Sequence, residues 1–277
     1  MYQKATRKQS KLRMTIDGPA GAGKTYTALR FAFALAQGGR VAMLDTEHGS
    51  ASKYAGEAPD GYPWEFDTEN LTTFSPEKYT EAILAASKAS YSVLVIDSLS
   101  HAWEGKGGAL EMKDRSGDKN SYTAWRNVTP IHNRMVDTIL QAPLHIITTM
   151  RSRMEYVQDL DESGKKVVGI RKVGLAPIQR PGMEYEFDIV CDMNWDHILT
   201  VSKSRCSAIV DLKTEKPGPA FLQPVIEWLN SGSPSVRKLE PDELMAQYGV
   251  DKVLAANGGN IPNTPEEWAT VAASLGK

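Results

Sequence analysis

Hydrophobic and polar residues alternate over residues 12–16, as expected for a strand with one face in a core. The alternation stops at Gly18, and apolar residues then recur at helical spacing over residues 24–35. The segment between these two patterns is rich in glycine and other small residues. The sequence therefore predicts a buried strand, a tight glycine loop and a helix, in that order.

Three more apolar runs, at 40–45, 91–97 and 144–149, are short and continuous. Such runs are typical of strands that are buried on both faces of a parallel sheet. Helix-start signals predict helices over about 75–89 and 129–140, because each begins with a polar residue followed by proline. This alternation of strands and helices predicts an α/β fold, with a mostly parallel twisted sheet flanked by helices.

Two later stretches lack a regular pattern. Residues 104–120 contain four glycines and charges of both signs, and we predict a mobile loop there. Residues 151–180 carry seven basic and four acidic residues, and they include a hairpin-like turn at 159–164. Two further strands are expected at 185–193 and 197–202.

The end of the chain changes in composition. A last core helix or turn is expected at 218–229, and residues 231–235 read as a linker because they are serine, glycine and proline. Short helical patterns follow, around 240–248, 250–256 and after Thr264. We therefore predict three parts: a basic N-terminal arm at 1–13, a core at 14–230, and a linker with a small helical tail at 231–277.

Composition narrows the class of protein. Of the 277 residues, 41% are hydrophobic and 24% are charged, as in an ordinary soluble globular protein. The 32 basic and 34 acidic residues leave no global positive field, so any nucleic-acid contact must come from a local basic strip. Two cysteines indicate a reducing compartment. We find no signal peptide and no membrane-spanning run, so a cytoplasmic protein without a membrane partner is expected.

The glycine loop carries the strongest motif. Gly18, Gly23, Lys24 and Thr25 satisfy the phosphate-loop pattern G-x-x-x-x-G-K-[ST], and the predicted strand and helix supply its required context. Backbone N–H groups of such a loop surround the phosphates, the lysine bridges the β- and γ-phosphates, and the threonine hydroxyl binds Mg²⁺. We expect ATP and Mg²⁺ as ligands. The residues expected to contact the nucleotide are Gly18, Pro19, Ala20, Gly21, Ala22, Gly23, Lys24, Thr25 and Tyr26.

A second nucleotide element is expected at Asp97, which ends the apolar run 91–97. Parallel strands present their carboxyl ends at one edge of the sheet, so this carboxylate should reach the Mg²⁺ beside Thr25. An aspartate at a strand end is a weak signal alone. After a phosphate loop it becomes a specific prediction of a metal ligand.

Three ordered strings resemble a known family. They are Val41 to Glu47 (VAMLDTE), Val95 to Ser98 (VIDS) and Thr200 to Arg205 (TVSKSR). In this order and at comparable spacing they resemble the core of RecA and RadA recombinases. More specifically, residues 11–230 are similar to phage-encoded RecA-like ATP-binding proteins of recombination and single-strand annealing. The resemblance implies a RecA-like ATPase core, ATP hydrolysis on single-stranded DNA, and the host cytoplasm as its location.

The resemblance also implies roles for acidic residues. Glu47 falls on the glutamate that orients the water attacking the γ-phosphate, and Asp97 falls on the Mg²⁺ aspartate. Glu77 and Glu81 stay open as alternatives to Glu47, because bacterial members take this glutamate from a later segment. Thr149 departs from the polar amide that often senses the γ-phosphate in relatives.

Lys203 and Arg205 match the basic pair that recombinases present to the ATP of a neighbouring subunit. If so, ATP lies between subunits of an oligomer, whether ring or filament. Segments 104–120 and 151–180 occupy the positions of the family's DNA-binding loops, where Tyr156 would stack on a base. The resemblance further implies a single-strand-binding protein as a partner.

Two other functions stay open. The string at 16–24 (IDGPAGAGK) also occurs in small nucleotide kinases, although Asp45-Thr46-Glu47 has no kinase role. An ATP-switched oligomeric scaffold without significant turnover is the other alternative.

Overall fold

The computed structural model of the chain describes residues 4, 6–117, 120–160, 167–233, 245 and 249–275. The chain divides into two compact units, which we describe separately. The larger unit comprises residues 11–229, and the smaller one combines residues 1–10 with 230–277.

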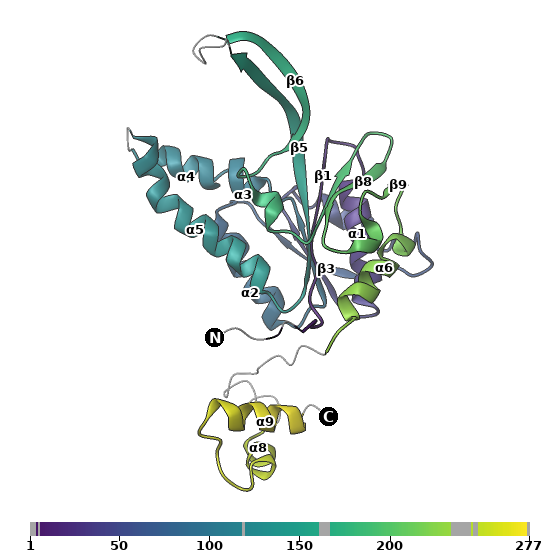
Figure 1. Cartoon of the computed structure of the whole chain (residues 1–277), viewed down its shortest axis with the longest axis vertical. Helices are drawn as coiled ribbons and strands as arrows, with labels where there is room; N and C mark the ends of the chain where they lie inside the picture. The colour runs from purple at the N-terminus through teal and green to yellow at the C-terminus, as the bar shows by residue number, and fades with distance from the viewer. Residues whose placement is uncertain are drawn as a thin grey trace. The chain divides into compact units, whose positions relative to one another are not determined.

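The larger unit is built on one twisted sheet, drawn in Figure 1. Its strands, in chain order, are β1 (Arg13–Gly18), β2 (Val41–Asp45), β3 (Phe66–Asn70), β4 (Val93–Asp97), β5 (His145–Leu160), β6 (Val167–Pro177), β7 (Ile189–Met193), β8 (Ile198–Ser204) and β9 (Lys213–Glu215). The spatial order is β3-β2-β4-β5-β1-β7-β8-β9, and β6 pairs with β5 alone. Neighbouring strands from β3 to β7 are parallel, whereas β6, β8 and β9 are antiparallel to their partners.

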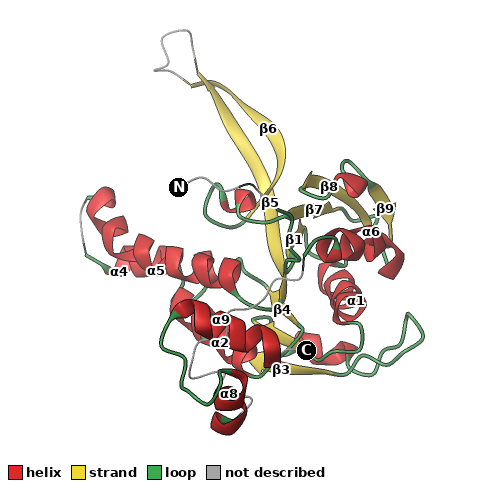
Figure 2. Ribbon diagram, turned by 60° about the horizontal axis from the view of Figure 1, so that its bottom comes forward, coloured by secondary structure: helices red, strands yellow, loops and turns green. Residues whose placement is uncertain are grey.

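Helices cover both faces of this sheet, as Figure 2 shows. They are α1 (Lys24–Ala36), α2 (Pro76–Lys88), α3 (His101–Glu104), α4 (Ala109–Arg115), α5 (Ser121–Gln141) and α6 (Pro219–Asn230). Single 3₁₀ turns occur at η1 (Ser50–Tyr54), η2 (Met183–Tyr185) and η3 (Ser207–Ile209). The predicted α/β fold with a mostly parallel, helix-flanked sheet is confirmed.

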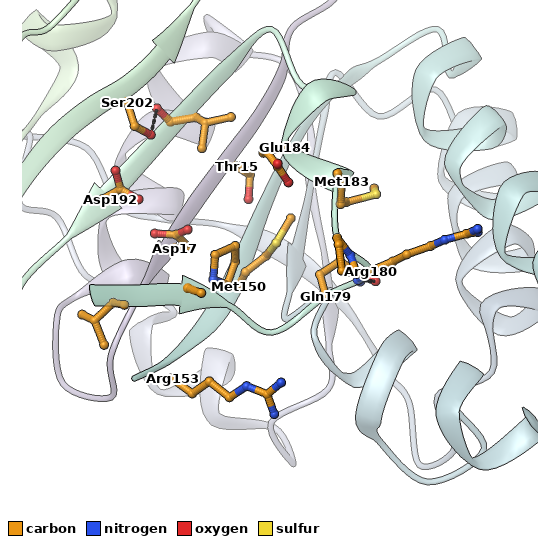
Figure 3. Close-up of a pocket in the computed structure, with 16 residues that line it drawn as sticks. Thr15, Asp17, Met150, Arg153, Gln179, Arg180, Met183, Glu184, Asp192 and Ser202 are labelled. Atoms are coloured by element: carbon orange, nitrogen blue, oxygen red, sulfur yellow. Dashed lines mark hydrogen bonds between the residues drawn. The ribbon is translucent and has the colours of Figure 1, made fainter. Parts of the chain in front are cut away.

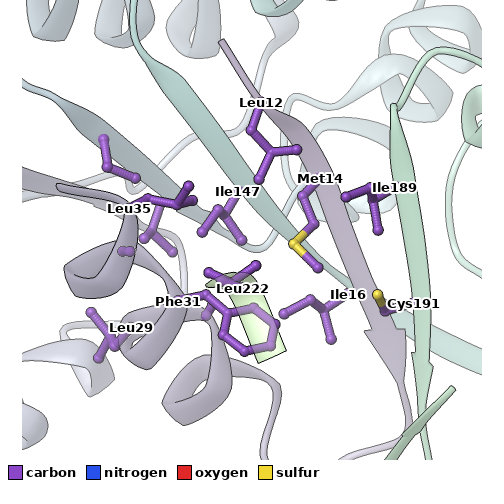
Figure 4. Packing of buried hydrophobic residues seen from close by; sticks show 14 of the residues in the cluster. Leu12, Met14, Ile16, Leu29, Phe31, Leu35, Ile147, Ile189, Cys191 and Leu222 are labelled. Carbon is purple, nitrogen blue, oxygen red and sulfur yellow. The ribbon is translucent and has the colours of Figure 1, made fainter. Parts of the chain in front are cut away.

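Two cores lie on opposite faces of the sheet because strand side chains alternate. On β1, Met14 and Ile16 pack toward α1 and α6, as Figure 4 shows. Phe31 of α1 stacks there on Phe221 of α6, with ring centroids 5.1 Å apart. The intervening residues of β1 face the other side, which α2 and α5 cover over much of the sheet.

The predicted strand at 144–149 and the predicted hairpin are parts of one structure. β5 starts between β1 and β4 in the sheet and then continues into an antiparallel pair with β6. This pair runs from Ser152 opposite Pro177 to Leu160 opposite Val167. Figure 1 shows it projecting beyond the rest of the sheet. The predicted turn lies mostly in 161–166, outside the described residues.

The predicted loop at 104–120 is wrong in part, because α4 forms inside it. The Glu111 carboxylate stabilises this helix by accepting a hydrogen bond from the Gly107 backbone N–H and by pairing with Arg115 one turn later. Local charge pairs thus outweigh the glycines that indicated a loop.

The following helix begins earlier than predicted. The Asn120 side chain accepts a hydrogen bond from the backbone N–H of Tyr122 at 2.9 Å, so α5 starts at Ser121 and contains Pro130. β3 was not predicted, since only Phe66 of its five residues is strongly apolar. It forms through backbone pairing with β2.

At the N-terminus, Arg13 is buried as the first residue of β1, although the sequence placed it in the basic arm. Its guanidinium donates to backbone carbonyls of Leu140, Ala142 and Leu144. Burial lowers the Arg13 pKa to about 10, against the opposing charge of Asp188.

In the smaller unit, Lys8 bridges Ser233, and the helices α8 (Val250–Ala256) and α9 (Pro265–Leu275) pack on each other. The predicted helix at 240–248 lies almost wholly outside the described residues. Among the described parts of both units, no helix has the length and apolar content needed to cross a bilayer.

Candidate active site

The glycine loop connects β1 to α1 in the conformation that a phosphate cradle requires. A Cβ on Gly18 would stand 2.4 Å from the Met193 carbonyl oxygen of β7, so only glycine fits. Gly23, at φ 94°, is the last residue before α1. The backbone N–H groups of the first turn of α1 therefore point into the loop, where they and the helix dipole favour an anion.

Lys24 lies within this cradle. Its ammonium donates to the carbonyl oxygens of Gly18 and Pro19, both at 2.8 Å. Burial lowers the Lys24 pKa, while the charges of Asp97 and Glu47 oppose that change. The charges of Asp97 and Glu47 thus act on the Lys24 ammonium, which also donates to the glycine loop. The motif predicts that this ammonium contacts phosphate oxygens.

Asp97 ends β4 beside the loop. Its carboxylate accepts a hydrogen bond from the Thr25 hydroxyl at 2.6 Å and another from the Thr149 hydroxyl of β5. Burial raises the Asp97 pKa, and these two hydrogen bonds oppose the change by favouring the ionised form. A carboxylate and a hydroxyl in contact at the loop fit Mg²⁺, which prefers oxygen ligands, so Thr25 and Asp97 would hold the metal.

Glu47 lies just beyond β2, and Asp45 organises the turn that carries it. The Asp45 carboxylate accepts hydrogen bonds from the backbone N–H groups of Glu47 at 2.6 Å and Ala51 at 2.9 Å. The Glu47 carboxylate pairs with the Arg151 guanidinium, whose Nη2 atom lies 2.7 Å from each of the two carboxylate oxygens. Glu77 and Glu81 lie elsewhere, on the exposed side of α2, and Glu81 pairs with Lys78. The structure thus brings Glu47, rather than these two alternatives, to Lys24 and Asp97.

A buried network behind Glu47 was not predicted. The Thr46 hydroxyl contacts the His101 Nδ1 atom at 2.6 Å and accepts from the Ser98 backbone N–H at 2.8 Å. The Tyr79 hydroxyl donates to the Ser98 carbonyl at 2.9 Å. The peptide bond between Asp97 and Ser98 is cis. This network joins the ends of β2 and β4, whose register brings Asp45 opposite Asp97.

His197 was also missed. It lies in the turn between β7 and β8, and its Nδ1 atom is 3.0 Å from the Ala22 carbonyl oxygen. It therefore supports the glycine loop from the far side. Local sequence contains no signal for this contact, since the two residues meet only through strand pairing.

Tyr26, predicted to contact the nucleotide, lies on α1 against two aromatic residues. Its ring centroid is 5.2 Å from that of Trp64 and 5.9 Å from that of Tyr54. Thr149, which departs from the amide that relatives often carry at this position, donates a hydrogen bond to the Asp97 carboxylate.

Lys203 and Arg205 lie at the opposite end of the sheet from the glycine loop. Because β8 runs antiparallel to β7, Arg205 is hydrogen-bonded beside Asp188, roughly 16 Å of strand before Met193. The Lys203 ammonium donates to the carbonyls of Glu184, Tyr185 and Phe187 at 2.7–3.0 Å. Neither cation can therefore reach the phosphate loop of its own chain.

Of the two predicted DNA-binding segments, one contains α4 and the other is the β5–β6 hairpin. Residues 118–119 and 161–166 lie outside the described residues. The backbone of Tyr156 belongs to β5, but its side chain is beyond what the structure describes. The described Arg151 and Arg153 lie at the base of the hairpin, and Arg151 pairs with Glu47.

Comparison with known proteins is consistent with this geometry. A family model described as an AAA domain matches residues 10–216, which include the glycine loop, Glu47, Asp97 and the hairpin. No curated protein matches the chain. The match covers most of the chain and supports an ATP-binding ATPase, and members of this family generally use ATP with Mg²⁺. The chain therefore belongs to the AAA domain family of P-loop ATPases.

Proposed function

We propose that this ATPase is an oligomeric, RecA-like protein that hydrolyses ATP when it is bound to single-stranded DNA, in recombination or strand annealing. The observation that carries the proposal is the ion pair between Glu47 and Arg151. It joins Glu47, whose charge acts on Lys24 of the phosphate loop, to the base of the projecting β5–β6 hairpin.

The acid has a defined chemical task. A lytic water needs a hydrogen-bond acceptor within reach, and a carboxylate beside the cradle is suited to orient it. In the ion pair, both Glu47 oxygens accept from Arg151, which leaves less capacity for a water. A hairpin displaced by DNA would move Arg151 and release the carboxylate, so turnover would depend on DNA.

The hairpin is a suitable DNA contact because of its charge. Its sequence contributes Arg153, Arg171 and Lys172 in addition to Arg151, against a chain whose net charge is close to zero. Such cations bind phosphates without sequence preference and with strong dependence on salt. A single-strand-binding protein would be a partner that supplies the same DNA.

Lys203 and Arg205 support an oligomer in a specific way. They lie too far from their own phosphate loop to act there, so any role on ATP requires a neighbouring subunit. A cation supplied in trans can raise turnover by about 10³–10⁵. Turnover should then depend on protein concentration and assembly.

The decisive experiment measures ATP turnover and molecular mass together, with and without single-stranded DNA, at low salt. We expect turnover to rise with DNA and with assembly. Mixing Lys203→Ala with Lys24→Ala protein should partly restore the activity that each variant lacks alone. Turnover that is unchanged by DNA at low salt would contradict the proposal.

The alternatives give different results. An ATP-switched scaffold would change mass with ATP, while Glu47→Gln would leave a negligible turnover unchanged. A nucleotide kinase would transfer phosphate to a nucleoside or nucleotide. Products limited to ADP and free phosphate exclude that kinase.

A further inference from the structure

A second pocket lies on the sheet face opposite α1, between β1, β7 and the base of the β5–β6 hairpin. Its volume is about 490 Å³, within the range of small-molecule sites. Figure 3 shows side chains of β1, β5 and β7 and of the segment after β6 around it. None of the residues that form the phosphate cradle lines this pocket.

The floor of the pocket contains a polar group without a partner. Thr15 is 1% exposed, and its hydroxyl makes no hydrogen bond. Buried hydroxyls are normally satisfied, and one that is not costs about 1–3 kcal/mol. The Thr15 hydroxyl is therefore available to donate and accept hydrogen bonds with a molecule in the pocket.

Beside it lies a pair of acids. Asp17 is 6% exposed, and its neighbour across the β1–β7 pairing is Asp192. Burial, followed by the hydrogen bond and the charge of Asp192, raises the Asp17 pKa to about 9. One proton is therefore retained near neutral pH, and the pair offers both a donor and an acceptor.

The rest of the pocket has a different character. Met150, Met183 and Val190 are buried apolar residues on its walls, and Pro177 of β6 also lines it. The exposed Arg153 lies at its rim. The pocket thus combines hydrogen-bonding groups at the floor, apolar walls, and a cation at the entrance.

We propose that this pocket binds a nucleotide, with the base against Thr15 and Asp17 and the phosphate at Arg153. Bases present mixed donors and acceptors on their edges, and proteins read unstacked bases by such contacts between apolar walls. Guanidinium groups are preferred partners of phosphate. A metal ion fits less well, because the described residues contain no cluster of three or more side chains of the metal-binding types.

The same chemistry could come from a free mononucleotide or from an unstacked nucleotide of a DNA strand. In the second case the inference rests on the proposed function, because the hairpin base would then hold the strand. The experiments below separate the two sources.

The first experiment titrates deoxynucleoside 5′-monophosphates into protein saturated with ADP and Mg²⁺, so that the phosphate loop is occupied. Calorimetry should show one site for a free mononucleotide. Thr15→Val and Arg153→Ala should each raise the Kd of the mononucleotide about tenfold, as expected for the loss of one hydrogen bond or one charged contact. Thr148→Val is the matched control, because this buried hydroxyl also lacks a partner but does not line the pocket.

The second experiment uses an oligonucleotide with one 2-aminopurine, whose emission rises when the base leaves the stack. If the ligand belongs to a strand, emission should rise on binding and lose most of that rise in Thr15→Val and Arg153→Ala, but not in Thr148→Val. Anisotropy measures total DNA binding in the same samples. Thr15→Val is nearly isosteric, and Arg153 is exposed, so at least one variant will fold.

The outcomes are distinct. One outcome is that DNA binds, that the rise in emission is the same in both variants as in the native protein, and that no mononucleotide binds. This outcome overturns the pocket and leaves the proposed function intact. Mononucleotide binding that depends on Thr15 and Arg153 supports the pocket even if DNA does not bind. The absence of both kinds of binding overturns the pocket and the DNA role together.

Discussion

Asp97 of β4 and Asp17 of β1 are both buried near the carboxyl ends of their strands, yet different kinds of groups surround their carboxylates. Asp97 accepts hydrogen bonds from two hydroxyl donors, Thr25 and Thr149. Asp17 instead faces a second acid, Asp192, and a hydroxyl that contacts neither. Burial raises the pKa of both carboxyl groups.

The difference shows how one fold makes two kinds of polar site. Donors favour the charged carboxylate, which prepares Asp97 for a cation. A neighbouring acid favours the protonated form, which prepares Asp17 for an uncharged hydrogen-bonding partner. Environment, rather than residue type, therefore assigns the two roles.

The largest expected effect tests the first site. Asp97→Asn keeps the size of the side chain but removes the negative charge that would face Mg²⁺. We expect ATP turnover to fall by at least about a hundredfold, because charge stabilisation at a reacting phosphate contributes several kcal/mol. Steady-state phosphate release over a Mg²⁺ titration measures the loss. Asp211→Asn, on an exposed loop, should change turnover little.

The next prediction concerns the pH dependence of stability. Folded Asp17 holds its proton up to about pH 9, whereas the unfolded chain releases it near 3.8, so stability falls as pH rises through this window. Asn at this position cannot titrate. We expect Asp17→Asn to gain roughly 2–4 kcal/mol relative to the native protein between pH 5 and pH 8.

Urea unfolding at three or four pH values measures this difference. Parallel stability curves for the two proteins would show that Asp17 is ionised in the folded state, and the contrast with Asp97 would then fail. Asp211→Asn again serves as the control, since its side chain is exposed.

A smaller effect is expected at the link between the hairpin and Glu47. Arg151→Ala should bring the ratio of turnover with DNA to turnover without DNA close to one. This variant removes the ion pair with Glu47, so a movement of the hairpin no longer changes the surroundings of Glu47. Arg40→Ala is a matched control, since Arg40, just before β2, also pairs with an acid, Asp67 of β3. A ratio that stays at the native value in Arg151→Ala would exclude the Glu47 link.

The smallest effects compare single hydroxyl groups. Thr149→Val removes a donor to the Asp97 carboxylate and should cost about 1.5–3 kcal/mol of the free energy of unfolding. Thr15→Val removes a hydroxyl that has no partner, and it should change that free energy by less than about 1 kcal/mol or increase it. Thermal and urea unfolding of both variants measure these changes in the free energy of unfolding. Equal costs for the two would contradict the contrast.

Much of the fold was predictable because local patterns decide it. Buried parallel strands read as short apolar runs, which is why β2, β4 and the first part of β5 were found. The loop at Gly18 and Lys24 was found because its chemistry needs small residues at fixed spacing. β3 was missed because an edge strand with a polar sequence depends on its neighbour's backbone.

The candidate site was predictable only where strand ends converge. Thr25 lies at the start of a recognisable helix, and Glu47 and Asp97 follow or end recognisable strands, so their meeting follows from a parallel sheet. The contact between His197 and the loop joins residues far apart in sequence. The Thr15 hydroxyl has no partner, and this too depends on the packing of distant segments. Local sequence patterns do not predict such contacts.

β5 is one unbroken strand of 16 residues, held by β1 and β4 on both sides at its first half and by β6 alone at its second. No loop separates the halves, although the pairing with β6 has register shifts at Glu155/Tyr156 and at Asp159/Leu160. The part of β5 beyond Arg151 is roughly 30 Å long, and it joins the sheet near Thr149 and Arg151. Under the proposed function, a force on DNA bound at the hairpin would pass along this single backbone to Thr149, whose hydroxyl contacts Asp97.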